Sequence, residues 1–153
     1  MNNIFMIIGS GINGLVAKEV ADSMECFEKI GFVDDNEKWT PNVTEVIGKT
    51  SDRDTLSCEY VNAFVVIDDS EARISILQWI EEETTCRIMS FISPRAYESS
   101  SAQIMKGCNI EPMAVVRTGR VIETGFIIYA GAIVRHSSIC SNGVHIVYNA
   151  TVA

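Results

Sequence analysis

The sequence predicts an α/β domain followed by a parallel β-helix, and two observations carry that prediction. An apolar run, Ile4–Ile8, leads directly into a segment with three glycines, 9–14, as in a buried parallel strand followed by a tight turn. After Pro94, aliphatic residues recur every six positions, a period that neither a helix nor an ordinary strand has. We therefore expect two domains, residues 1–91 and 92–153.

Composition argues against several kinds of partner. The net charge is −8, with 20 acidic and 12 basic residues, and this field repels phosphate polymers, so we expect no nucleic-acid partner. The five cysteines are odd in number and form no CxxC pair, which favours reduced thiols over disulfides or a metal site. The run Ile4–Ile8 is too short to cross a membrane and no basic n-region precedes it. We therefore expect a cytoplasmic protein with no membrane partner.

The first domain alternates segments with strand and helix patterns. Apolar residues recur at helical spacing after the glycines, and the polar segment 36–55, which contains Pro41, predicts a loop with little regular structure. The expected elements are a strand over 4–8, a helix over about 13–24, strands over 30–33 and 63–67, a helix over about 70–82 capped by Ser70, and a strand over 86–91. This order predicts a parallel α/β layer.

Residues 9–14 read Gly-Ser-Gly-Ile-Asn-Gly, a G-x-G-x-x-G pattern between a strand and a helix, as in Rossmann-like domains. Such a loop lets the backbone approach a phosphate, which the helix N-terminus then stabilises. Asp34 and Asp35 end the next strand about twenty residues on, where a carboxylate can bind a ribose hydroxyl. Taken alone, the pattern predicts NAD or a similar dinucleotide, or else a tight turn that holds no ligand.

The six-residue repeat predicts a three-sided prism. Its aliphatic positions are Ile104, Ile110, Val116, Ile122, Ile128, Val134, Ile146 and Val152, with Cys140 in the same series. The residues two positions earlier are mostly small, namely Ala102, Cys108, Ala114, Ala132, Ser138 and Ala150, whereas Arg120 and Phe126 break this second series. One hexapeptide per face gives about three coils, with the aliphatic side chains stacked inside.

Six segments carry a resemblance to a known family. They are the glycine loop 9–14, Gly31-Phe32-Val33-Asp34-Asp35, Val46-Ile47-Gly48, Ile92-Ser93-Pro94-Arg95-Ala96, Ala132-Ile133-Val134-Arg135-His136 and Val144-His145-Ile146. Together they resemble the NeuD/PglD-type family, acetyltransferases that act on sialic acid or on amino sugars linked to nucleotides. The resemblance extends along essentially the whole chain. It implies a left-handed β-helix, acetyl-CoA as co-substrate, no metal, and a homotrimer.

The resemblance also implies roles for individual residues. His136 matches the general base, which takes the proton from the attacking amine or hydroxyl, and Ser137 follows it where the family usually has an acidic residue. His145 matches a residue that contacts the acetyl-CoA thioester, and Gly131 is assigned to the same cofactor site. The residues implied to bind the nucleotide part of the sugar substrate are Gly9, Gly11, Ile12, Asn13, Asp34 and Asp35.

The repeat register adds a geometric expectation for the two histidines. Val134 points inward, so His136 lies at a corner and faces out. His145 lies between two inward residues, Val144 and Ile146, and also faces out. Nine residues separate the histidines, which places them on the order of 15 Å apart in one chain. If they share a site, we expect them to come from neighbouring subunits.

Three functions remain open. The first is an acetyl-CoA-dependent sugar acetyltransferase, although Asp68 stands where the family usually has glycine and Tyr129 where it tends to have a small polar residue. The second is a truncated, non-catalytic homologue that binds nucleotide sugars, because family members usually continue for several coils beyond Ala153. The third is a fragment of an NAD-dependent oxidoreductase, which would explain the glycine loop and leave the repeats unexplained.

Overall fold

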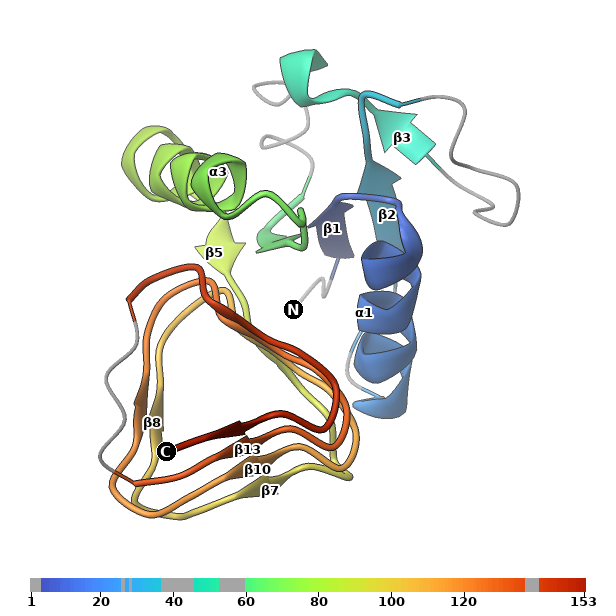
Figure 1. Cartoon of the computed structure of the whole chain (residues 1–153). Coiled ribbons are helices and arrows are strands. Elements are labelled where there is room, and N and C mark those ends of the chain that lie inside the picture. Colours follow the sequence, from blue (N-terminus) through green and yellow to red (C-terminus); the bar gives the residue numbers. More distant parts are fainter. Residues whose placement is uncertain (1–3, 26, 28, 37–45, 53–59, 137–140) are drawn as a thin grey trace.

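The computed structural model describes residues 4–25, 27, 29–36, 46–52, 60–136 and 141–153. Its N-terminal part is a five-stranded parallel sheet with the order β3-β2-β1-β4-β5, flanked by helices α1 and α3 (Figure 1). The elements are β1 (Ile4–Ile8), α1 (Ile12–Ser23), β2 (Lys29–Val33), β3 (Val46–Gly48), the 3-10 turn Thr50–Asp52, β4 (Asn62–Val65), α3 (Ser70–Glu83) and β5 (Arg87–Ile88). The expected parallel sheet is confirmed.

The segment 36–55 contains more regular structure than its polarity predicts. Strand β3 pairs with β2, and a 3-10 turn follows it. Ile47 of β3 packs over Gly31 of β2, where a Cβ atom would come within 2.7 Å of the Ile47 side chain. The interpretation of this segment as a loop with little regular structure did not include β3, because this strand is short and is ordered by pairing and packing rather than by its own sequence pattern.

Helix α3 begins differently from the prediction. Asp69, rather than Ser70, is the N-cap residue, and its carboxylate accepts a hydrogen bond of 2.8 Å from the Ala72 amide. Ser70 is the first helical residue, and its hydroxyl donates to the carbonyl oxygen of Gly143 at 2.8 Å. Ser70 therefore connects the helix to the C-terminal part of the chain.

The C-terminal part is a triangular prism of short parallel strands (Figure 1). Its strands are β6 (Phe91–Ile92), β7 (Tyr97–Glu98), β8 (Gln103–Ile104), β9 (Asn109–Ile110), β10 (Val115–Val116), β11 (Val121–Ile122), β12 (Ile127–Ile128), β13 (Ile133–Val134), β14 (His145–Ile146) and β15 (Thr151–Val152). They form three stacks, β14-β12-β9-β6, β15-β13-β10-β7 and β11-β8. Paired residues are one coil apart, as in Val115 with Ile133, so the predicted three-sided winding is confirmed.

The prism starts earlier than the repeats suggest. The predicted strand 86–91 is divided, because β5 pairs with β4 in the sheet whereas β6 pairs with β9 in the prism. The Phe91 amide donates to the carbonyl oxygen of Cys108 at 2.8 Å, which fixes β6 in the first coil. The chain thus passes from the sheet into the prism between β5 and β6.

The interior of the prism is filled by residues of the two predicted series, together with Phe126, which takes a position of the second series with a large side chain. Its buried members are Cys108, Ile110, Ala114, Val116, Ile122, Phe126, Ile128, Ala132, Val134 and Ile146, while Ile104 and Val152 are partly buried. Cys140 and Ser138 lie outside the described residues. Cys86 and Cys108 are buried, and burial raises the pKa of the Cys108 thiol to about 11. Cys108 is therefore a protonated core residue at neutral pH.

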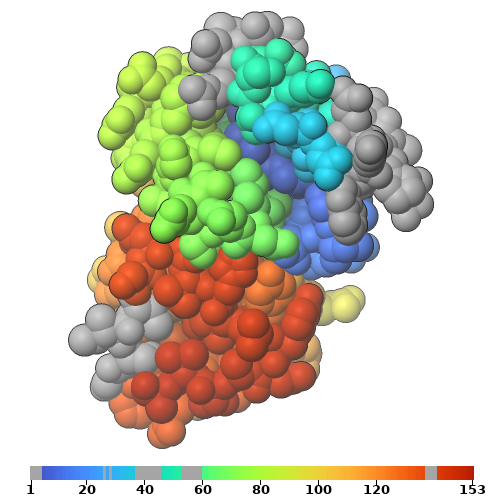
Figure 2. Space-filling model, turned by 45° about the horizontal axis from the view of Figure 1, so that its top comes forward, coloured from blue at the N-terminus to red at the C-terminus, as the bar shows by residue number. Residues whose placement is uncertain are grey.

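One corner of the prism packs against α3. Gly107, Gly125 and Gly143 occupy this corner in successive coils with positive φ, and Cβ atoms built on them would come within about 3 Å of Leu77 or Ile74 of α3. Figure 2 shows the surface around the start of α3 lying directly on the last coil. No helix within the described ranges is long and apolar enough to cross a membrane.

Candidate functional site

A pocket of about 430 Å³ lies at the carboxyl ends of β1, β2 and β4, where α1 begins. This is the point at which the strand order reverses, because the chain continues from β1 to one side and later to the other. The residues lining it are Ile8, Gly9, Gly11, Ile12, Asn13, Val33, Asp34, Asp35, Asn36, Thr50, Val66, Ile67, Asp68 and Asp69. All six residues predicted to bind the nucleotide are among them.

The glycine loop is shaped by close backbone contacts. Gly9 has φ +111, and a Cβ atom on Gly14 would lie only 2.0 Å from the Gly9 carbonyl oxygen, so both positions require glycine. Gly11 is the N-cap of α1 without a side-chain cap, and nothing lies within 4 Å of its Cβ position. The first amides of α1 can therefore donate to an acceptor group in the pocket.

Asp34 and Asp35 each form hydrogen bonds to another segment beside the pocket. The Asp34 carboxylate accepts from the amide and the hydroxyl of Ser10, each at 2.7 Å, and from the Asn36 amide at 2.8 Å. Burial alone would raise the pKa of Asp34, but the hydrogen bonds from Asn36 and Ser10 outweigh it and lower the pKa. Asp35 accepts from the Thr50 amide at 2.8 Å and from its hydroxyl at 2.6 Å. A ligand that donates hydrogen bonds to Asp34 or Asp35 would therefore bind carboxylates that already accept hydrogen bonds from the protein.

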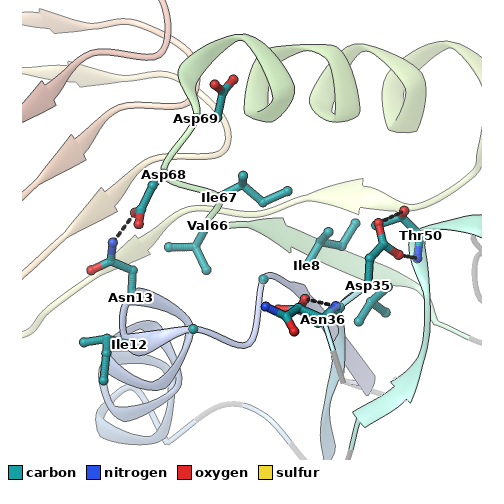
Figure 3. Close-up of a pocket in the computed structure, with 14 residues that line it drawn as sticks. Ile8, Ile12, Asn13, Asp35, Asn36, Thr50, Val66, Ile67, Asp68 and Asp69 are labelled. Atoms are coloured by element: carbon teal, nitrogen blue, oxygen red, sulfur yellow. Dashed lines mark hydrogen bonds between the residues drawn. The ribbon is translucent and has the colours of Figure 1, made fainter. Parts of the chain in front are cut away.

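Asp68 and Asn13 face one another at the other end of the pocket (Figure 3), and the Asn13 amide donates to the Asp68 carboxylate. With Asp34, Asp35 and Asp69, four carboxylates are among the described residues that line the pocket, and none of those residues is a lysine or an arginine. The carboxylates favour ligand groups that carry hydroxyl or amino hydrogens, and the backbone amides of the glycine loop can donate to a phosphate. Within the described residues, no group of His, Cys, Asp or Glu side chains is placed to hold a metal ion.

His145 lies in β14, on the prism face that packs against the N-terminal part. Its side chain points out of the prism as expected, but it is half-buried beneath the N-terminal part. Its Nδ1 lies 3.4 Å from the hydroxyl of Tyr129, and the two rings are 5.9 Å apart. Burial lowers the pKa of His145, Arg73 lowers it further, and Asp68 opposes both. The ring is therefore neutral at pH 7.

His136 lies elsewhere, exposed at the corner that follows β13. Among the described residues, no hydrogen bond or ring contact connects it to His145 or to the pocket. Ser137 is outside the described residues. Gly131 has φ +73 in the turn between β12 and β13, and a Cβ atom there would lie 2.3 Å from the Asn149 amide oxygen of the next coil. Gly131 is thus required by the stacking of the coils.

Two residues near the site escaped prediction from the sequence. Arg73 of α3 is fully buried and donates to the carbonyl oxygens of Ile67, Gly125 and Gly143. Arg73 precedes the buried residues Leu77 and Ile80 by four and seven positions, which places all three on the inner face of the helix. This helical spacing could have predicted from the sequence that Arg73 is buried. The second residue is Tyr129, which contacts His145. The 18-residue register could have shown this proximity, because it pairs His145 with Ile127, two residues before Tyr129.

Comparisons with known proteins agree with this architecture. The sequence model of the PglD N-terminal domain family matches residues 4–80, half of the chain. No curated protein matches the chain. The acetyltransferase domain of PglB from Neisseria gonorrhoeae, solved in complex with acetyl coenzyme A, is similar with a TM-score of 0.86 and 25% identity, covering 99% of this chain and 82% of that one.

Two further structures share the fold. A variant of perosamine N-acetyltransferase from Caulobacter crescentus, in complex with CoA and GDP-perosamine, has a TM-score of 0.70 and 17% identity, covering 96% of this chain and 75% of that one. WeeI from Acinetobacter baumannii has a TM-score of 0.56 and 14% identity, covering 97% and 95%. The family match spans the glycine loop and strands β1 to β4 of the sheet, and the similarity to PglB continues through the prism. The chain therefore belongs to the NeuD/PglD-type family of sugar acetyltransferases.

Proposed function

We propose that this protein transfers the acetyl group of acetyl-CoA to an amino or hydroxyl group of a sugar, either a nucleotide-linked amino sugar or a sialic-acid-like sugar. The observation that carries the proposal is the similarity of the whole chain, sheet and prism together, to an acetyltransferase domain that holds acetyl coenzyme A. The glycine-loop pocket would take the nucleotide sugar at the carboxyl ends of the strands. Its carboxylates suit the hydroxyl and amino groups of such a ligand.

In the proposed reaction, His136 is the general base. It takes a proton from the sugar nitrogen or oxygen as that atom attacks the thioester carbonyl carbon. The carbon–sulfur bond then breaks, and the CoA thiolate leaves and is protonated by His136. His145 and Gly131 belong to the acetyl-CoA site, where the His145 ring donates to the oxyanion. Ser137 stands beside the base, and the scheme needs no metal.

We place the complete site between neighbouring subunits of a homotrimer. His136 is exposed at one corner of the prism, whereas the pocket lies in the N-terminal part and His145 lies on the face beneath it. A neighbouring copy could bring its His136 to this pocket, which a single chain does not do. The proposal includes a Rossmann-like domain over 1–91, a left-handed β-helix over 92–153, and a cytoplasmic location.

Ligand stabilisation and turnover test this proposal together. Acetyl-CoA and a UDP- or GDP-linked amino sugar should each raise the Tm, because a ligand that binds only the folded state stabilises it. Their mixture should release free CoA thiol. His136→Ala should abolish that release with a nearly unchanged Tm, because the side chain is exposed. Stabilisation by nucleotide sugars alone would indicate a non-catalytic homologue, and stabilisation by NAD alone would indicate an oxidoreductase.

A further inference from the structure

Tyr129 connects the glycine-loop pocket to His145. Its side chain is only 8% exposed, and its ring packs in the core between the prism and the N-terminal part. The Tyr129 hydroxyl accepts from Nδ2 of Asn13 at 3.0 Å and lies 3.4 Å from Nδ1 of His145. Asn13 also donates to the Asp68 carboxylate. A continuous series of hydrogen bonds therefore leads from Asp68, in the pocket, to the histidine.

The carboxylate of Asp68 sets the direction of this series. A carboxylate can only accept, so the nitrogen of the Asn13 amide, and not its oxygen, must face Asp68. That nitrogen carries two hydrogens, one for Asp68 and one for the Tyr129 oxygen. Because the tyrosine oxygen accepts from Asn13, its single proton remains to be donated to Nδ1 of His145.

The donated proton decides the form of the imidazole. A neutral ring that accepts at Nδ1 carries its own proton on Nε2. Nε2 of His145 is buried and has no hydrogen-bond partner within the part of the chain that the structure describes. The charged groups that act on this ring are Arg73 and Asp68, and the titratable group in contact with it is Tyr129, on which Glu111 acts in turn. An unpaired buried N–H favours binding of an acceptor group there.

We propose that Tyr129 is a positioning residue that holds His145 in the Nε2–H form, so that this N–H serves as the donor to the carbonyl oxygen of the acetyl group. The inference rests on the proposed role of His145 in binding acetyl-CoA. A donor fixed in advance stabilises the oxyanion more than one that must change its tautomer during the reaction. Because Asn13 and Asp68 line the pocket, the sugar site and the histidine share one hydrogen-bond series.

Nitrogen-15 NMR of the full-length protein at pH 7.5 tests the tautomer directly. The chain has only two histidines, and His136→Gln assigns the remaining ring to His145. We expect an unprotonated Nδ1 and a protonated Nε2 in the wild-type protein. Tyr129→Phe should populate both tautomers. Tyr148→Phe is the matched control, because it removes a hydroxyl from an exposed ring that packs on Tyr129 at 4.7 Å, and it should leave the spectrum unchanged.

Asn13→Ala gives an independent variant that leaves the buried tyrosine ring in place. Without a donor from Asn13, the tyrosine oxygen can accept from Nδ1–H, so both tautomers should appear here as well. A wild-type ring protonated on Nδ1, or a Tyr129→Phe spectrum identical to wild type, would overturn the proposal. These measurements need no acetyl-CoA, so a protein without turnover would contradict the proposed function and leave the tautomer result valid.

Kinetics give a second readout if the enzyme is active. Tyr129→Phe should lower kcat roughly tenfold with little change in the KM of acetyl-CoA, because a positioned donor acts mainly on the transition state. A variant that raises KM alone would show that Tyr129 supports ground-state binding and not the position of the donor. The Tm of each variant, measured beside its kcat, shows whether the protein remains folded.

Discussion

Arg73 of α3 donates a hydrogen bond of 2.9 Å from its Nε to the carbonyl oxygen of Gly125, at a corner of the β-helix. The same guanidinium donates to the carbonyl oxygens of Ile67 and Gly143, and the side chain is 0% exposed. These partners are neutral main-chain oxygens, so hydrogen bonds to neutral groups compensate the buried charge. The contact fixes α3, and with it the pocket residues Asp68 and Asp69, onto two successive coils.

Replacement of this guanidinium should destabilise the protein strongly. Arg73→Met would leave several buried carbonyl oxygens without donors, so we expect a loss of about 3 kcal/mol in the free energy of unfolding. Urea denaturation measures this loss. Arg117→Met is the matched control, because Arg117 is exposed and the same change should then cost no more than about 0.5 kcal/mol. Equal stability of the two variants would contradict the role of Arg73.

The lowered pKa of His145 predicts a pH dependence of stability. The unfolded chain binds a proton at His145 near its ordinary pKa of 6.5, whereas the folded protein binds it only at lower pH. The unfolded state therefore carries more protons in this window, and stability falls as the pH decreases from about 6.5 towards the folded pKa. Above 6.5 the contribution is constant.

A comparison of variants isolates this effect from other titrating groups. The free energy of unfolding of the wild type minus that of His145→Gln should decrease between neutral pH and the folded pKa. A flat His145 difference would mean that the folded and unfolded pKa values are equal.

The six-residue period was sufficient to predict the prism, because whether a side chain points inward depends on its position within its own hexapeptide. Ile110, Val116 and Ile122 are accordingly fully buried. The glycine loop likewise predicted the pocket, since a tight turn at the end of β1 places Gly9 and Asn13 around one crevice. Both features are local consequences of the sequence.

The docking of the two parts was harder to predict, because it depends on residues distant in sequence. The hydroxyl of Ser70 donates to the carbonyl oxygen of Gly143, and this contact is not visible in the local pattern that predicted the helix. His145 was expected to face out, but the solvent on that side is replaced by Tyr129 and the N-terminal part. Its lowered pKa follows from this docking and not from the repeat register.

Replacement by alanine should affect Gly11 and Gly14 of the glycine loop differently. A Cβ atom on Gly14 would lie 2.0 Å from the Gly9 carbonyl oxygen, so Gly14→Ala should cost about 3 kcal/mol or more of stability. Gly11 has φ −63 and open space around its Cβ position, so Gly11→Ala should fold normally. Its methyl group would project into the pocket lining, so we expect weaker binding of nucleotide sugars with an unchanged Tm. Full binding by Gly11→Ala would place the ligand elsewhere.

Alanine at the corner glycines can separate backbone strain from packing against α3. Gly119 and Gly125 have nearly the same φ, +67 and +72, so the conformational cost of alanine, about 1 kcal/mol, should be shared. Nothing lies within 4 Å of the Gly119 Cβ position, whereas that of Gly125 comes within 3.0 Å of Ile74 and Leu77. Gly125→Ala should therefore lower the free energy of unfolding more than Gly119→Ala does. Because the backbone strain is the same in both variants, the difference between their losses in the free energy of unfolding reports the packing of α3 on the β-helix. Equal losses would mean that α3 moves to accommodate the new methyl group with no loss of stability.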